Sequence, residues 1–308
     1  MTGLISQESQ AAYRQFCENR TLYFDYEHAG PDVFEQMTKA NTQAIWECAK
    51  PYWDGVHVET KELDGFSIEV ITIDGADPDQ YIYYIHGGGF VHGEAAWGHF
   101  CAVNIAKESK KNIVAVTYRL APEHRFPAGV NDCIAAYAWM LEKGIKPENI
   151  VFLGESSGGN LVLATAIGCK QKGLPMPKAI AAISPVVNLK FDFPSYQGRA
   201  ERECILPYNQ DRFAQYCYMQ DKDLENPLAS PYFGDCTGFP PVFIGVSTEE
   251  VLFDDSVRMH EKLLKEGVDS RLIVWEGMWH TFYMMDFPES WTVFKQVSEF
   301  FAEMDNAQ

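Results

Sequence analysis

A serine flanked by glycines follows a short apolar run near the middle of the chain. The stretch Gly154-Glu-Ser-Ser-Gly-Gly-Asn160 comes directly after Ile150–Leu153. A strand that ends in Gly-x-Ser-x-Gly and opens into a helix holds the serine on a sharp turn, where its hydroxyl can attack a carbonyl carbon. That turn needs small residues two positions away on either side. Ser156 has glycine at both positions, whereas Ser157 has Glu155 at one of them, so the pattern favours Ser156 over Ser157. A serine that merely caps a helix is the alternative that this pattern alone leaves open.

A run of three glycines, His86-Gly-Gly-Gly-Phe90, ends another apolar stretch upstream of the serine. Main-chain N–H groups without a neighbouring Cβ can point outward and stabilise the oxyanion of a tetrahedral acyl-transfer intermediate. We assign the donors as the N–H groups of Gly87 and Gly88, with the N–H of Ser157 as the third. The alternative is a loop that cradles a phosphate, but neither Gly-x-Gly-x-x-Gly nor a Gly-Lys-Ser/Thr ending is present.

A serine hydroxyl needs a base before it can attack a carbonyl, and the base needs a carboxylate that orients it. In this arrangement the acid and then the histidine follow the serine along the chain. Only two histidines lie downstream of Ser156. His260 falls inside a helical stretch, whereas His280 follows the apolar run 272–275 and a turn. We therefore predict His280 as the base.

Four carboxylates compete for the role of the acid after the strand predicted at Val242–Val246. They are Glu249, Glu250, Asp254 and Asp255. Either aspartate would cap the helix that follows, because aspartate is favoured at the first position of a helix. The loop position therefore favours Glu249 or Glu250, and the residues alone leave the choice between them open.

Composition excludes several other classes of function. The 308 residues include 25 basic and 43 acidic side chains, for a net charge of −18, which disfavours binding to nucleic acid or to anionic lipid. No run of 18 apolar residues predicts a membrane span, and the N-terminal residues lack the basic and apolar regions of a secretory signal. The cysteines are scattered without zinc spacing, so we expect reduced thiols, no metal and a cytoplasmic protein.

Short apolar runs alternate with longer amphipathic segments along the chain. This alternation is typical of an α/β fold with a mostly parallel sheet that helices cover on both faces. The predicted strands are 67–73, 81–85, 113–118, 150–153, 179–183, 242–246 and 272–275, and the predicted helices lie near 97–110, 128–143, 158–172, 255–267 and 288–304.

Two segments interrupt the alternation of strands and helices. Residues from about 1 to 55 look helical and precede the first predicted strand, and residues from about 187 to 230 are too many for an ordinary connection. The middle of the second segment, Pro207–Gln220, is a candidate helix. We predict one catalytic domain over residues 1–308, with both segments folded over it as a cap.

Together these motifs resemble the hormone-sensitive-lipase-like branch of the α/β-hydrolases, from about residue 65 to 290. His86–Phe90 looks like the oxyanion motif of the family, Tyr118–Ala128 like the stretch after the next strand, and Asn226–Pro231 like the end of the cap. The family acid is usually Asp, followed by three residues and a second Asp. Glu250-Val-Leu-Phe-Asp254 matches with Glu in the first place, so the resemblance selects Glu250. Ser157 stands where the family usually has Ala.

The resemblance implies an α/β-hydrolase fold with a helical cap. It also implies a carboxylesterase that hydrolyses short-chain acyl esters through an acyl-enzyme, without metal or cofactor. The partner is then a small-molecule ester, and formation of a homodimer stays open. An amide or peptide hydrolase on the same scaffold is one alternative, and a non-catalytic ligand-binding receptor is another. The cap would line the acyl pocket with aromatic side chains, and the candidates are Phe191, Phe193, Tyr196, Tyr208, Phe213, Tyr216 and Tyr218.

Overall fold

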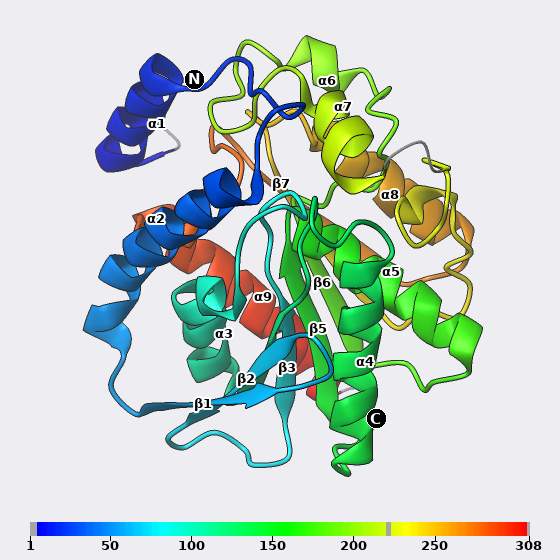
Figure 1. Ribbon diagram of the computed structural model, residues 1–308. Helices are drawn as coiled ribbons and strands as arrows, with labels where there is room; N and C mark the ends of the chain where they lie inside the picture. Colours follow the sequence, from blue (N-terminus) through cyan, green and yellow to red (C-terminus); the bar gives the residue numbers. More distant parts are fainter. Residues whose placement is uncertain (1–4, 220–222, 307–308) are drawn as a thin grey trace.

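An eight-stranded sheet forms the centre of the protein (Figure 1). The computed structural model describes residues 5–219 and 223–306. The strand order is β1-β2-β4-β3-β5-β6-β7-β8; β1 and β4 each run antiparallel to β2, and all other neighbours are parallel. The strands are β1 (Val56–Glu62), β2 (Ser67–Ile73), β3 (Tyr81–Ile85), β4 (Asn112–Thr117), β5 (Ile150–Glu155), β6 (Ala179–Ile183), β7 (Val242–Ser247) and β8 (Ser270–Trp275).

Helices cover both faces of this sheet, as Figure 1 shows. Along β3, Tyr83 and Ile85 pack into one apolar core and Ile82 and Tyr84 into the other, because successive side chains of a strand point to opposite faces. Helices α4, α5 and α8 contribute to the first core, and α3 and α9 to the second. The helices are α1 (Gln7–Asn19), α2 (Pro31–Ala49), α3 (Cys101–Ser109), α4 (Ala128–Glu142), α5 (Ser157–Lys172), α6 (Ser195–Gly198), α7 (Gln210–Phe213), α8 (Phe253–Lys265) and α9 (Pro288–Asn306). The predicted mostly parallel α/β sheet is confirmed.

The first strand of the sheet, β1, was not predicted. It pairs with β2 in full register, from Val56 opposite Ile73 to Glu62 opposite Ser67. Its side chains between the two ends are mostly exposed, since β1 lies at the edge of the sheet and carries polar residues. An edge strand of this kind has no apolar run, so hydrophobic patterning does not indicate it.

Two segments distant in sequence meet over one end of the sheet, where α1, α6 and α7 lie in Figure 1. We call residues 5–55 and the described part of 187–230 the cap segments. The N–H of Tyr208 donates to the carbonyl of Leu22 at 2.8 Å, and Arg20 donates to the hydroxyl of Tyr208. At the start of the chain, the hydroxyl of Ser9 donates to Glu289 of α9 at 2.6 Å. The first cap segment is therefore held both by the second cap segment and by α9, the last helix.

The helix predicted at Pro207–Gln220 is shorter in the structure. It consists of α7 and a wider π-helical turn, Ala214–Tyr218, and Gln220 lies outside the described residues. Short 3₁₀ turns occur at Lys50–Tyr52, Ala95–His99, Pro147–Asn149, Pro231–Phe233 and Phe282–Met284. In the described ranges, no helix is both long and apolar enough to cross a membrane. All eight cysteines lie in these ranges, and each is a free thiol.

Candidate active site

Ser156 lies on a tight turn between β5 and α5. Its backbone has φ 57° and ψ −120°, a conformation that residues other than glycine rarely adopt. Its N–H donates to the carbonyl of Ile183 at 2.9 Å. A Cβ on Gly158 would overlap the carbonyl of Ile85, and one on Gly154 would overlap the backbone of Gly158. Glycine is therefore required on both sides of this serine, as the sequence predicted.

The imidazole of His280 lies between Ser156 and Glu250. Its Nε2 is 3.0 Å from Oγ of Ser156, and its Nδ1 is 2.7 Å from Oε2 of Glu250. All three residues are buried, with relative exposures of 9 % for Ser156, 2 % for His280 and 0 % for Glu250. The structure thus brings together the three predicted residues in the order hydroxyl, imidazole, carboxylate, which a base-activated serine requires.

The loops that carry the imidazole and the carboxylate are joined to each other. The N–H of Glu249 donates to the carbonyl of Met278 at 3.1 Å, and the N–H of Gly277 donates to the hydroxyl of Thr248 at 2.8 Å. The other oxygen of Glu250, Oε1, accepts from the N–H of Ser247 and from the hydroxyl of Ser184. Sequence reasoning missed Ser184, whose signal is its place directly after β6.

The competing acids and the second histidine are held elsewhere. Glu249 contacts Arg202 at 3.6 Å, Asp254 accepts from the N–H of Ser195 at 3.0 Å, and Asp255 accepts from the hydroxyl of Tyr196 at 2.6 Å. Nδ1 of His260 lies 2.8 Å from the hydroxyl of Ser270, which is remote from the serine turn in the sheet. Of the carboxylates after β7, Glu250 is the one that contacts His280.

The glycine run after β3 lies against the serine turn, but one predicted donor is already engaged. The N–H of Gly87 donates to Oε1 of Glu155 at 2.7 Å, and the hydroxyl of Tyr84 donates to the same oxygen at 2.8 Å. Glu155 is buried, so this N–H points into the protein interior. The prediction that Gly87 is an oxyanion donor is therefore corrected, because a buried carboxyl group occupies its N–H.

The remaining donors of this region are not engaged. In the described part of the chain, no acceptor lies at the N–H groups of Gly88, Gly89 and Ser157. Gly88 has φ 101°, and a Cβ there would overlap the carbonyl of His92, so glycine is required. The hydroxyl of Ser157 accepts from the N–H of Phe90 at 3.3 Å, which links the serine turn to the glycine run.

Burial and nearby carboxyl groups set the charge states around the serine. Burial alone would lower the pKa of His280, but the hydrogen bond and charge of Glu250, followed by the charges of Glu203 and Glu155, raise it above its ordinary value. Burial raises the pKa of Glu155 to about 8, against the hydrogen bonds that it accepts. Glu155 is thus mostly protonated at neutral pH, so its charge contributes to the pKa of His280 only in the ionised fraction.

His86 lies behind the glycine run rather than beside the serine. Its Nδ1 is 2.7 Å from the carbonyl of Gly87, and its ring stacks on Tyr118 at 4.2 Å between centroids. Burial lowers the pKa of His86 to about 3, so the ring is neutral. These contacts indicate a structural role, in which His86 holds the loop.

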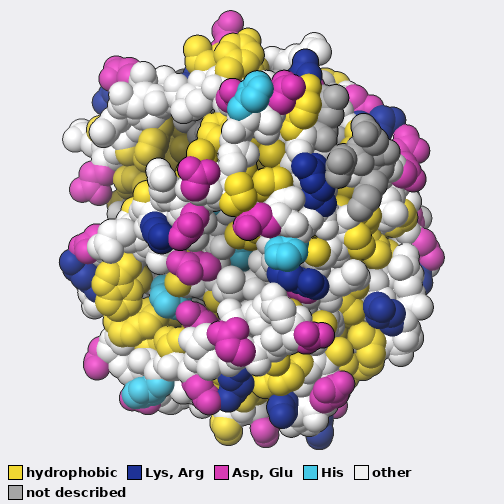
Figure 2. Space-filling model, viewed as in Figure 1, with side chains coloured by type: hydrophobic (Ala, Val, Ile, Leu, Met, Phe, Trp, Pro, Cys, Tyr) yellow, Lys and Arg dark blue, Asp and Glu magenta, His cyan; other side chains and the backbone are white. Residues whose placement is uncertain are grey.

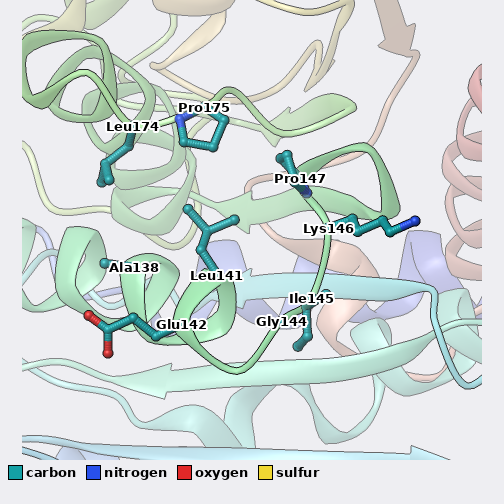
Figure 3. Close-up of a pocket in the computed structure, with 9 residues that line it drawn as sticks. All are labelled: Ala138, Leu141, Glu142, Gly144, Ile145, Lys146, Pro147, Leu174 and Pro175. Carbon is teal, nitrogen blue, oxygen red and sulfur yellow. The ribbon is translucent and has the colours of Figure 1, made fainter.

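An apolar groove at the opposite end of the sheet is separate from this site (Figure 3). Its lining includes Leu141 and Glu142 of α4 together with Lys146 and Pro147, which precede β5. Ser156 follows the other end of the same strand. On the face shown in Figure 2, acidic side chains are interspersed with basic ones and no extended basic region is visible.

Comparisons with known proteins agree with this geometry. Residues 82–284 match the family described as alpha/beta hydrolase fold. The chain is 31% identical over 234 residues to an esterase of Acinetobacter venetianus, covering 75% of this chain and 77% of the relative. It is 34% identical over 202 residues to an acetyl-hydrolase of Streptomyces hygroscopicus, covering 66% and 68%.

Solved structures are similar over nearly the whole chain. An esterase from the bacterial hormone-sensitive lipase family superposes with a TM-score of 0.88 at 28% identity, covering 97% of this chain and 99% of that one. An esterase/lipase from an uncultured bacterium has a TM-score of 0.89 at 32% identity, covering 98% and 100%. The chain therefore belongs to the α/β-hydrolase fold family, in its hormone-sensitive-lipase-like branch.

Proposed function

We propose that the protein is a carboxylesterase that hydrolyses short-chain acyl esters with Ser156, His280 and Glu250. The observation that carries this proposal is the line of contacts from Oγ of Ser156 to Nε2 of His280 at 3.0 Å and from Nδ1 to Glu250 at 2.7 Å. The named relatives support the reaction class, since they include an esterase and an acetyl-hydrolase.

In the first step, His280 takes the proton of Ser156 as the hydroxyl oxygen attacks the ester carbonyl. Glu250 stabilises the imidazolium that forms and is not itself protonated. The oxyanion accepts hydrogen bonds from the N–H groups of Gly88, Gly89 and Ser157, which have no protein acceptor in the described residues. His280 then gives its proton to the leaving alcohol, and the acyl group stays on Ser156.

In the second step, water replaces the alcohol and attacks the acyl-enzyme. His280 takes a proton from this water, the same N–H groups hold the second oxyanion, and collapse of the intermediate returns the proton to Ser156. The side chains described above suffice for the proton transfers of both steps.

The cap is part of the same proposal. The two cap segments join through Tyr208 and Leu22, and Phe191 and Phe213 of the second segment pack edge to face with their ring centroids 5.5 Å apart. We infer that these segments cover the acyl site of a single domain over residues 1–308. A cytoplasmic location agrees with the free thiols. Light scattering on the purified protein distinguishes a monomer from a homodimer.

A series of p-nitrophenyl esters of increasing acyl length tests the proposed function. We expect the highest kcat/KM between acetyl and butyryl esters. Absence of hydrolysis across the series, together with no covalent labelling by a serine-directed organophosphate, would refute the esterase and favour a ligand-binding receptor. A matched anilide tests for an amide hydrolase, which would cleave the anilide at a rate comparable to the ester.

A further inference from the structure

A buried carboxylate of the second cap segment lies against the loop that carries Glu250. Glu203 has a relative exposure of 1 % although it belongs to a surface turn between α6 and α7. Its Oε2 accepts from the N–H of Val251 at 3.0 Å. Val251 directly follows Glu250, so Glu203 holds the peptide unit next to the side chain that contacts His280.

The other oxygen of Glu203 fixes its own turn. Oε1 accepts from the N–H of Ile205 at 2.8 Å and from the N–H of Leu206 at 3.1 Å. Both oxygens of Glu203 thus accept from backbone donors. Three such donors favour the ionised carboxylate, because a protonated oxygen would lose acceptor capacity.

The first cap segment holds the same turn from outside. Arg20 donates to the carbonyls of Ala200 at 3.0 Å, Glu201 at 3.3 Å and Glu203, and the hydroxyl of Tyr13 donates to the carbonyl of Arg202 at 2.7 Å. The turn that carries Glu203 therefore cannot move away from the loop of Glu250 without breaking contacts with the N-terminal residues.

Titratable groups from four parts of the chain face one another here. His280 is surrounded by Glu250 after β7 and Glu203 of the cap, whose charges favour the imidazolium, and by Glu155 at the end of β5, which is mostly protonated at neutral pH. Burial, followed by the charge of Glu250, raises the pKa of Glu203 above its ordinary value, although the charge of His280 and the N–H groups of Ile205 and Leu206 act to lower it. The basic groups nearby are the guanidinium of Arg20, on the carbonyl of Glu203, and that of Arg199, on the carbonyl of Thr248.

We infer that Glu203 is a positioning residue of the active site, which fixes the loop of Glu250 to the cap and adds a buried negative charge beside His280. The side chain does not contact the serine or the substrate carbonyl. It acts on the base through the Val251 N–H and through its charge. The cap then contributes to catalysis as well as to covering the acyl site. This inference rests on the proposed function.

The pH dependence of kcat/KM on p-nitrophenyl butyrate tests this role. Glu203→Gln removes the charge and places an amide NH₂ against a backbone N–H. We expect its acid limb to move to lower pH, because the imidazolium loses a stabilising charge, and its plateau to fall by roughly tenfold to a hundredfold through displacement of the loop. Glu203→Asp keeps the charge but is one methylene shorter, so its plateau should fall while its acid limb stays near that of the wild type.

The matched control is Glu201→Gln, which removes an exposed carboxylate from the same turn. We expect its plateau and its acid limb to match the wild type. The inference is overturned by a wild-type profile of Glu203→Gln, by a lowered plateau with an unmoved acid limb, or by an equal shift in Glu201→Gln. If Glu203→Gln does not fold, Glu203→Asp decides, and an unchanged plateau overturns the inference. An inactive wild type would instead refute the proposed function.

Discussion

Replacing Glu250 by glutamine removes one charge from the proposed triad and leaves its shape nearly unchanged. Oε1 of Glu250 accepts from the N–H of Ser247 at 2.6 Å and from the hydroxyl of Ser184 at 2.8 Å, while Oε2 lies 2.7 Å from Nδ1 of His280. If the amide oxygen keeps the first two donors, its NH₂ group faces Nδ1. That nitrogen must then be the acceptor, and the ring proton moves to Nε2.

This tautomer cannot take the proton of Ser156, because Nε2 already carries a hydrogen. The opposite amide orientation restores the contact with Nδ1–H but sets the NH₂ group against the N–H of Ser247 in a fully buried site. Either arrangement also leaves the imidazolium without its counter-charge. We expect kcat/KM to fall by about 10³- to 10⁴-fold, equivalent to about 4–5.5 kcal/mol of barrier.

The assay is the hydrolysis of p-nitrophenyl butyrate, with circular dichroism to verify the fold. Glu249→Gln is the matched control, since Glu249 is the adjacent carboxylate and contacts Arg202 rather than His280. Its kcat/KM should stay within about twofold of the wild type, as for other surface substitutions. The assignment of Glu250 would be refuted if its glutamine variant kept more than about a tenth of the wild-type activity, or if Glu249→Gln were the damaging change.

Three further outcomes follow from the same geometry. Ser156→Ala should abolish ester turnover. Ser157→Ala keeps its backbone N–H and loses one hydrogen bond from the N–H of Phe90, so it should cost about 1 kcal/mol of stability and keep most turnover. The reverse result in the butyrate assay contradicts the choice of nucleophile. Glu155→Gln should keep kcat/KM at neutral pH within about threefold of the wild type, because an amide resembles a protonated carboxyl group. Glu155→Ala frees the N–H of Gly87 and should lower kcat/KM by more than about tenfold. Equal activity of both variants would show that the hydrogen bond from Gly87 to Glu155 is dispensable. The raised pKa of His280 places the acid limb of kcat/KM above about pH 6.5, so activity is lost as the pH falls through this limb. An acid limb well below about pH 6.5 in a pH–rate profile would contradict the described surroundings of the imidazole.

The sequence indicated the proposed nucleophile and the proposed base because each assignment depends on local features. Glycines on both sides single out Ser156, and chain order leaves His280. Glu250 required the family resemblance, since adjacent carboxylates differ only in where their side chains point. The error at Gly87 has the same origin: the direction of Glu155 and of the Gly87 N–H is a property of the packed interior that no spacing in the sequence encodes.

The fold, too, could be predicted from the sequence only where local patterns indicate it. The buried strands were predictable because they are continuous apolar runs, whereas β1 is polar and exposed and gave no such signal. Glu203 belongs to no motif. A glutamate in a polar segment is typical of a surface residue, and its burial depends on Arg20 and Val251, which are distant in the chain.

The hydrogen bond from Ser9 to Glu289 joins residues 280 positions apart, almost the full length of the chain. During synthesis α1 leaves the ribosome before its partner residues in the second cap segment, and Glu289 of α9 follows later still. A nascent chain therefore holds Arg20 without its contacts until residues 200–208 are made, and Ser9 without its partner until α9 is made. The cap, and with it the surroundings of His280, can be completed only once α9 is made, so translation products that stop before α9 should lack esterase activity even when they contain Ser156.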